Sequence, residues 1–137
     1  MNVLIVKNIY GSEFQKYEEL LYQLRINYKI VRSKAAAISL LEKQISNDDI
    51  EEQNKIEGII LDLSIPEDDN GRNYDKKMGL EIISYLMKNN MKVPVIINSE
   101  LVLKDYEKNY PYIYGQFGNK YEPSILEKFL EYIFSLE

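Results

Sequence analysis

The chain has 137 residues, 45% of them hydrophobic and 28% charged, and its formal net charge is -5. These values are typical of one globular domain, here residues 1–137, that buries its own core. An acidic chain without a basic cluster lacks the surface that nucleic-acid-binding proteins need, so we expect no nucleic-acid partner. Cysteine and histidine are both absent. Their absence excludes disulfides, thiolate nucleophiles, histidine bases and the usual zinc ligands.

The sequence also lacks the features of membrane and secreted proteins. Residues 1–7 carry no charged leader and too short an apolar run for a signal peptide. No segment approaches the roughly 18 consecutive apolar residues of a membrane span. We therefore expect a cytoplasmic protein with no membrane partner.

In the first half of the chain, short apolar runs alternate with helical periodicity. Residues 3–6 form a continuous apolar run typical of a buried strand, and residues 12–26 have the spacing of a helix. A second strand is predicted over residues 28–31, and Ser33 is placed to cap the next helix. Apolar residues recur along that helix at Ala37, Leu40, Leu41 and Ile45. Residues 58–63, apolar on both faces, predict the third strand.

The second half continues this alternation. Gly79 opens a helix with apolar residues on one face, namely Ile82, Ile83, Leu86 and Met87. Strands are predicted over residues 93–97 and 112–117, with a short, weak helix over residues 101–109 between them. Pro123 suits the first turn of the last helix. The inward face of this helix is expected to carry Leu126, Phe129, Leu130 and Ile133.

Five strands alternating with five helices predict parallel pairing through right-handed crossovers. The expected fold class is α/β, a flavodoxin-like doubly wound five-stranded parallel sheet of order 2-1-3-4-5 with helices on both faces. In that order the first and third strands are neighbours at the switch point, where such sheets bind ligands. Their carboxyl ends place Lys7, Asn8 and Asp62 together.

Residues with potential chemistry follow the predicted strands in a specific pattern. Asp62 ends the third strand, and Pro66 comes four residues later. The motif Gly79-Leu80-Glu81 opens a helix, Ser99 follows the fourth strand, and Lys120 follows the fifth. Together these features resemble the receiver domain of bacterial response regulators, of the chemotaxis-regulator type, and the resemblance covers essentially the whole chain.

The resemblance implies a role for each of these side chains. In that family the strand-end aspartate accepts a phosphoryl group from a histidine kinase, a role that falls on Asp62. The hydroxyl that hydrogen-bonds the phosphoryl oxygen corresponds to Ser99, and the cation that pairs with the acyl phosphate corresponds to Lys120. Phe117 matches the aromatic residue that swings inward on activation. A carboxylate nucleophile, a hydroxyl donor and a cation are suited to phosphoryl transfer.

One departure from the family changes the expected chemistry. Receivers carry an acidic pair after the first strand that holds Mg²⁺, and here those positions are Lys7 and Asn8. The ligands that remain are Asp62, the carbonyl of Ser64 and the amide oxygen of Asn8, a poor set for a hard cation. We therefore expect no cofactor, or weak Mg²⁺ binding at most. A Lys7–Asp62 ion pair, joined by Lys120, is expected to replace the metal.

Two other segments allow more than one interpretation. The acidic run within residues 66–77 invites a calcium site, but it lacks the alternation and the distal glutamate of an EF-hand. An exposed loop is the preferred prediction there. Aromatic residues gather around the predicted edge strand, namely Tyr106, Tyr110, Tyr112, Tyr114 and Phe117. In receivers the face of helix 4, strand 5 and helix 5 contacts partners and dimer mates, so this cluster predicts an interface, with ordinary edge packing as the alternative.

Two functions stay open, and the first is favoured. It is a stand-alone receiver-like signalling protein, not an enzyme, that acts through protein–protein interaction as a degenerate response regulator. The alternative is a functional single-domain response regulator phosphorylated on Asp62 by a histidine kinase in a two-component phosphorelay. A flavin or nucleotide enzyme is disfavoured because residues 7–12 form no phosphate-binding loop. A haloacid-dehalogenase-type phosphatase would need a second aspartate where Ser64 stands.

Overall fold

The structure is a computed structural model that describes residues 2–7, 12–46, 55–73, 75, 77–98, 110–117 and 123–136. Its strands are β1 (Asn2–Val6), β2 (Asn27–Val31), β3 (Ile56–Asp62), β4 (Val95–Asn98) and β5 (Ile113–Phe117). The helices of the described part are α1 (Ser12–Gln23), α2 (Lys34–Ser46), α3 (Gly79–Lys88) and α5 (Pro123–Ser135). None of the helices described is long and apolar enough to span a membrane.

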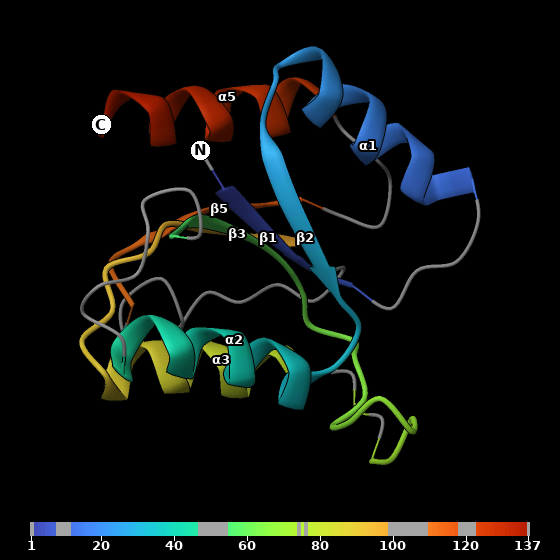
Figure 1. Cartoon of the computed structure of the whole chain (residues 1–137), viewed down its shortest axis with the longest axis vertical. Coiled ribbons are helices and arrows are strands. Elements are labelled where there is room, and N and C mark those ends of the chain that lie inside the picture. Colours follow the sequence, from blue (N-terminus) through green and yellow to red (C-terminus); the bar gives the residue numbers. More distant parts are fainter. Residues whose placement is uncertain are drawn as a thin grey trace.

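The five strands form one parallel sheet in the order β2-β1-β3-β4-β5. Helices α1 and α5 cover one face of this sheet, and α2 and α3 cover the other (Figure 1). The predicted flavodoxin-like fold and strand order are therefore confirmed. The predicted helix over residues 101–109 lies outside the described residues.

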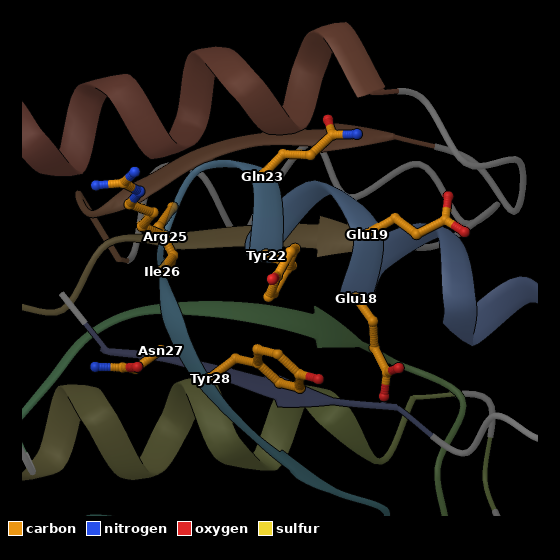
Figure 2. Close-up of a pocket in the computed structure, with 8 residues that line it drawn as sticks. All are labelled: Glu18, Glu19, Tyr22, Gln23, Arg25, Ile26, Asn27 and Tyr28. Carbon is orange, nitrogen blue, oxygen red and sulfur yellow. The ribbon is translucent and has the colours of Figure 1, made fainter.

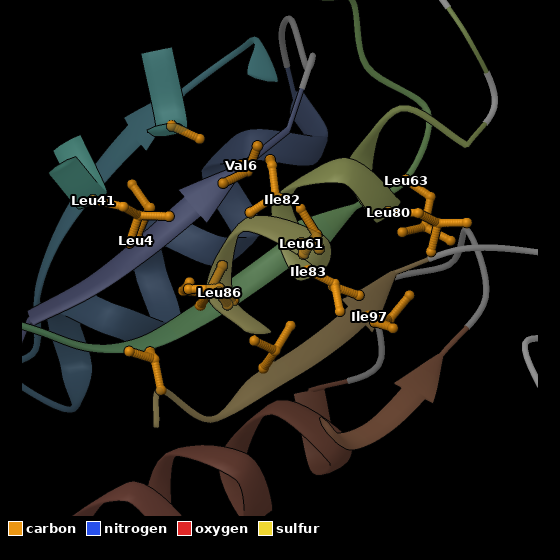
Figure 3. Packing of buried hydrophobic residues seen from close by; sticks show 14 of the residues in the cluster. Leu4, Val6, Leu41, Leu61, Leu63, Leu80, Ile82, Ile83, Leu86 and Ile97 are labelled. Atoms are coloured by element: carbon orange, nitrogen blue, oxygen red, sulfur yellow. The ribbon is translucent and has the colours of Figure 1, made fainter. Parts of the chain in front are cut away.

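Side-chain alternation along the strands divides the core into two clusters. Leu4, Val6, Leu61 and Ile97 face α2 and α3 and pack in the first cluster (Figure 3). Their neighbours in sequence face α1 and α5 in the second cluster, which includes Val3, Ile5, Ile60 and Ile96. Each fully buried aliphatic side chain contributes about 1.5–3 kcal/mol relative to an exposed one, so both faces stabilise the sheet. The four predicted inward residues of α5 are all buried.

Helix α1 ends earlier than predicted. Its C-terminus is a Schellman turn in which Ile26 N donates to Leu21 O at 2.9 Å and Arg25 N donates to Tyr22 O at 3.1 Å. Arg25 adopts the left-handed conformation that this turn requires, with a φ of 56°. The turn places Leu24 at the surface, although its spacing continues the apolar pattern of the helix.

The strand bounds differ from the predicted ones by one to two residues. Strand β3 begins at Ile56 and ends at Asp62. Strand β4 begins after Pro94, which has no N–H to donate, although Pro94 O still accepts a bond from Ile59 N at 3.0 Å. Strand β4 extends to Asn98, so its last residue is polar, and this residue enters the candidate site.

Candidate functional site

A layer of polar side chains lies at the carboxyl end of the sheet. Asp62 ends β3 and is paired in register with Asn98, the last residue of β4. Lys7 directly follows β1, whose last residue Val6 pairs with Leu61. The residues two positions earlier belong to the core cluster under α1 and α5, namely Ile5, Ile60 and Ile96. Because side chains alternate along a strand, Lys7, Asp62 and Asn98 lie on that same face.

Asp62 is half-buried, and its carboxylate is anchored to the backbone. The Oδ1 atom accepts a hydrogen bond from Ser64 N at 3.0 Å, which closes a local turn after the strand. This bond orients the carboxylate at the strand end. The role of Asp62 as a phosphoacceptor stays a prediction.

Lys7 is an almost fully buried cation. Its side chain is 7% exposed, and Nζ donates a hydrogen bond to the hydroxyl of Tyr17 at 3.3 Å. The same Nζ lies 4.9 Å from the centroid of the Tyr17 ring, within the range of a cation–π interaction. The main chain of Lys7 is held as well, because its N donates to Val31 O at 3.0 Å. Lys7 is thus anchored to α1 by its side chain and to β2 by its main chain, and the Lys7–Asp62 ion pair stays a prediction.

Asn98 is a polar residue of this layer that the sequence did not single out. It is 1% exposed and lies between Asp62 of β3 and Phe117 of β5 in the register of the sheet. A buried carboxamide presents both a donor and an acceptor, and such groups are normally hydrogen-bonded. The sequence signal that could have identified Asn98 is a polar residue directly after an apolar run and next to Ser99, a predicted site residue.

The described groups fit a magnesium ion poorly. Mg²⁺ prefers carboxylate and water oxygens in an octahedron, and the polar layer presents one carboxylate, Asp62, on the face that also holds the Lys7 ammonium. Within the part of the chain that the structure describes, no three acidic side chains gather as metal ligands. The described part of this edge therefore already carries a positive charge, that of the Lys7 ammonium.

Several predicted site residues lie outside the described residues. They are Asn8, Ser99 and Lys120. Phe117 is the last residue of β5, so its backbone lies in register with Asn98 of the polar layer. The assignments of these residues to phosphoryl binding and switching stay predictions.

The acidic loop after β3 docks on the N-terminus of α2. Lys34 N donates to Pro66 O at 3.0 Å and Ala35 N donates to Glu67 O at 2.8 Å. The buried Ser33 hydroxyl accepts from Ala36 N at 3.2 Å and donates to Asp69 Oδ1 at 2.7 Å. Ser33 is thus the helix cap that was predicted, and it is also one end of a clamp on the loop.

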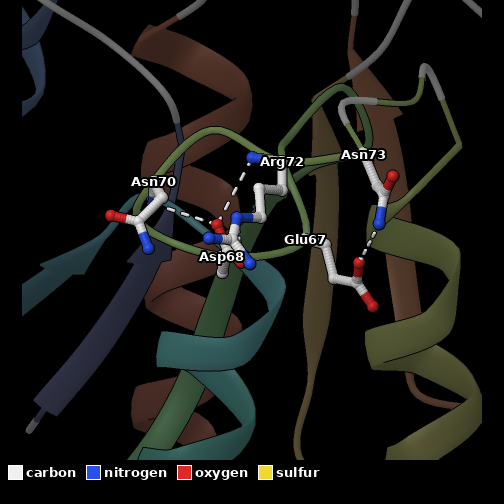
Figure 4. A network of polar contacts seen from close by, with 5 residues as sticks. All are labelled: Glu67, Asp68, Asn70, Arg72 and Asn73. Carbon is white, nitrogen blue, oxygen red and sulfur yellow. Dashed lines mark hydrogen bonds and ion pairs between the residues drawn. The ribbon is translucent and has the colours of Figure 1, made fainter.

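The carboxylates of Glu67 and Asp68, in contrast, bind groups within the loop itself (Figure 4). Asp68 Oδ1 accepts from Asn70 N at 3.0 Å and from Arg72 N at 3.3 Å, and Glu67 accepts from the amide of Asn73. The loop is exposed at its tip, as predicted, but its first residue Pro66 is buried. Its acidic side chains serve as turn-forming acceptors, which is a structural use of the acidic run.

An open groove of about 890 Å³ lies between α1 and the start of β2 (Figure 2). Glu18 and Tyr28 point toward each other across it, while Tyr22 projects from α1 nearby. Partial burial and the neighbouring Glu18 carboxylate raise the pKa of Tyr28 above its usual value of 10.0. The groove contacts the amino end of β2, so it lies away from the carboxyl edge that carries Asp62.

The aromatic residues around β5 divide into a buried and an exposed group. Tyr110 is 2% exposed and belongs to the core under α2 and α3, so it is not available for an interface. Tyr114 is exposed and packs against Tyr132 of α5 with ring centroids 5.0 Å apart. Phe134 of α5 and Leu136, which follows the end of this helix, are also exposed. Tyr106 lies outside the described residues.

Comparison with known proteins finds similarity in structure but not in sequence. The sequence matches no protein-family model and no curated protein. The structure is similar to the signal receiver domain of a protein described as a LuxO repressor from Vibrio parahaemolyticus, with a TM-score of 0.70 and 18% identity. That alignment covers 96% of this chain and 88% of the other.

Two further structures resemble the chain over nearly its whole length. One is a CheY-like response regulator receiver domain from Methylobacillus flagellatus, at 17% identity and a TM-score of 0.60, covering 97% of this chain and 98% of that one. The other is the receiver domain of sensor histidine kinase PA1611 from Pseudomonas aeruginosa, at 15% identity, a TM-score of 0.59 and 96% of both chains. The latter holds a magnesium ion coordinated in its active site cleft. At these identities the likeness concerns architecture, and the chain has the fold of response regulator receiver domains.

Proposed function

We propose that this chain is a receiver-like signalling protein that acts through protein–protein interaction and has a degenerate, metal-poor phosphorylation site at Asp62. The observation that carries the proposal is the nearly buried ammonium of Lys7 at the end of β1, on the same face of the sheet as Asp62. Phosphoryl transfer to a carboxylate needs a divalent ion to neutralise the incoming group. A fixed ammonium on the face that carries the carboxylate opposes the binding of that ion.

The surface formed by β5 and α5 is the proposed contact with a protein partner or a second copy. It exposes Tyr114 and Tyr132, whose ring centroids lie 5.0 Å apart. Aromatic residues that are exposed and packed against one another lose little side-chain freedom on binding, which makes them suitable anchors of an interface. The proposed contact is therefore centred on the pair of tyrosine rings.

The alternative function is a working response regulator that accepts a phosphoryl group on Asp62 from a histidine kinase. The position of Asp62 at the carboxyl end of β3, with its carboxylate oriented by Ser64 N, favours this alternative. This alternative needs a divalent ion at the site. The receiver domain of PA1611, which has the same fold, holds a magnesium ion coordinated in its active site cleft.

Phosphorylation with a small donor separates the two functions. The protein is incubated with acetyl phosphate or beryllium fluoride and Mg²⁺, then followed by intact mass and by NMR. We expect no phosphoryl adduct and little chemical-shift change. An adduct, or beryllofluoride-dependent shifts that vanish in Asp62→Asn, would establish the alternative.

Restoring the acidic pair provides a positive control. The double variant Lys7→Asp with Asn8→Asp is expected to bind Mg²⁺ markedly more tightly than the wild type, because two carboxylates replace an ammonium and an amide. Unchanged Mg²⁺ affinity in this variant would argue that residues 7 and 8 do not govern metal binding at this edge.

A further inference from the structure

We propose that Tyr17 is a positioning residue that holds the Lys7 ammonium at the Asp62 edge, so that the charge of a side chain permanently occupies the site where a receiver takes up a divalent ion. This inference rests on the proposed function and assigns a specific cause to it. It depends on the contact between the end of β1 and the middle of α1, which could not be predicted from the sequence alone.

The contact between the two side chains is close and sheltered from water. Lys7 Nζ donates to the Tyr17 hydroxyl at 3.3 Å and lies 4.9 Å from the ring centroid, while Tyr17 is 2% exposed. An ammonium is costly to remove from water unless electron-rich groups replace its hydration. Tyr17 supplies two such groups, a phenolic oxygen and a ring face. The tyrosine is therefore suited to retain a cation at this depth.

Both partners are held in place by their surroundings. The ring of Tyr17 packs in the core cluster under α1 and α5, together with Leu20 and Leu21 of its own helix. The main chain of Lys7 is bonded to Val31 of the neighbouring strand β2. With the start and the end of the lysine side chain both fixed, its ammonium is confined to the face of the sheet that carries Asp62.

The expected consequence is a competition between the ammonium and a divalent ion. While Tyr17 retains Lys7, the local positive charge disfavours Mg²⁺ at the Asp62 carboxylate. Without Tyr17, the flexible lysine side chain gains access to water and the ammonium leaves the edge. Tyr17 thereby sets the metal dependence of the site without contacting a metal or a phosphoryl group itself.

Two substitutions at position 17 separate the contributions of the hydroxyl and the ring. Tyr17→Phe keeps the ring and the packing but removes the hydroxyl that accepts the hydrogen bond, and Tyr17→Leu removes both. The matched control is Tyr22→Leu, which removes a tyrosine of the same helix that is 83% exposed. Lys7→Met removes the charge directly and serves as the reference for a site without the ammonium.

The primary measurement is the NMR signal of the Lys7 side-chain ammonium in ¹⁵N-labelled protein. A sheltered, hydrogen-bonded ammonium exchanges its protons slowly, so we expect a resolved signal in the wild type and in Tyr22→Leu. The signal is expected to weaken in Tyr17→Phe. In Tyr17→Leu we expect it to broaden beyond detection, because the ammonium protons exchange rapidly with water. Because Tyr17→Phe preserves the core packing, it keeps the test valid if Tyr17→Leu folds poorly.

The second measurement is the affinity for Mg²⁺ followed at the Asp62 and Ser64 amides. We expect Tyr17→Leu and Lys7→Met each to raise this affinity roughly tenfold, the scale on which one nearby charge alters a carboxylate. The two substitutions combined should raise it no further, because both remove the same ammonium from the same place.

The outcomes distinguish this inference from the function on which it rests. If Tyr17→Leu has the same Lys7 signal and Mg²⁺ affinity as the wild type, or if Tyr22→Leu changes them equally, the role of Tyr17 is wrong and the proposed function is unaffected. If the wild type itself is phosphorylated in Mg²⁺, the proposed function is wrong, and the Lys7 signal alone then decides whether Tyr17 positions the ammonium.

Discussion

The two faces of the sheet end differently at the same carboxyl edge. On the face under α2 and α3 the apolar core continues past the strands through Leu63 and Ile65, and the loop docked on Ser33 closes it. On the face under α1 and α5 the apolar side chains stop at Ile60 and Ile96, and the next residues on that face are polar. The residues at and directly after the end of β3 therefore close the apolar core on one face of the sheet and form a candidate site on the other.

This difference indicates where substitutions should affect stability and where they should affect chemistry. Residues of the closed face act through packing and hydrogen bonds, so their variants should unfold more easily while the polar layer keeps its properties. Variants of Tyr17 and Lys7 should instead alter the ammonium and the metal affinity, whatever they do to stability. The Lys7 ammonium signal, recorded in every variant that keeps Lys7, measures this separation directly.

The largest effect on the closed face is expected for Gly79→Ala at the start of α3. A Cβ there would lie 2.6 Å from Asp62 O and 2.7 Å from Leu63 Cα, both backbone atoms that cannot turn aside. We expect the free energy of unfolding to fall by roughly 2–3 kcal/mol, the upper range for overpacking, as measured by urea denaturation. The matched control is Gly115→Ala in β5, where no atom lies within 4 Å of the added Cβ. Equal losses in the two variants would contradict the close approach of α3 to the strand end.

A smaller loss is expected for Tyr110→Phe, which removes a buried hydroxyl. That hydroxyl lies 2.7 Å from Val93 O and 3.0 Å from Met91 O, and it accepts from Val93 N at 3.2 Å. Removing it leaves buried backbone groups unsatisfied at a cost of about 1–3 kcal/mol. The matched control is Tyr132→Phe, because Tyr132 lies at the surface of α5. A loss no greater than that of the control would mean that these bonds contribute little.

The same tyrosine should make stability depend on pH in the alkaline range. Burial raises the pKa of Tyr110 to about 12 from its usual 10.0. The unfolded chain therefore releases this proton at lower pH than the folded chain, so the contribution is complete below pH 10.0 and is lost as pH rises toward 12. Urea midpoints measured from pH 9 upward should fall less steeply in Tyr110→Phe than in the wild type. Parallel curves for the two proteins would contradict the raised pKa.

The smallest of the expected effects is that of Ser33→Ala. This variant loses the cap of α2 and the bond to Asp69, which together should lower the free energy of unfolding by about 1 kcal/mol. Hydrogen exchange in residues 66–73 should also increase, because the loop loses one of its attachments. The control is Ser46→Ala at the exposed end of the same helix, whose hydroxyl donates to Glu42 O. Faster loop exchange in the control as well would indicate that the clamp does not depend on Ser33.

Much of the architecture was predictable because apolar runs and caps are local signals. The strand order followed from the alternation of elements, and Ser33, Gly79 and Pro123 marked helix starts that the structure confirms. The exposed position of Leu24 was not predictable, since periodicity does not reveal the turn that ends α1 at Gln23. The exposure of Ile45 was not predictable either, because its spacing continues the apolar pattern of α2.

The arrangement of the site was only partly predictable. The position of Asp62 at a strand end could be inferred, because a carboxylate after an apolar run has one obvious place. The contact of Lys7 with Tyr17 could not be inferred, since it depends on how α1 docks on the sheet. The docking of the loop on α2 could not be predicted either, because Pro66 and Glu67 contribute backbone carbonyls, which leave no signal in the sequence.

The docked loop has a consequence for the electrostatics of the whole edge. The positive end of a helix macrodipole attracts anions through amides that lack partners. At α2 those amides already donate to Pro66 O, Glu67 O and Ser33 Oγ, and Asp69 adds a negative charge beside them. The attractive pole of α2 is thus neutralised from within the chain, and a phosphate group arriving at this edge would be drawn by lysine and not by this helix.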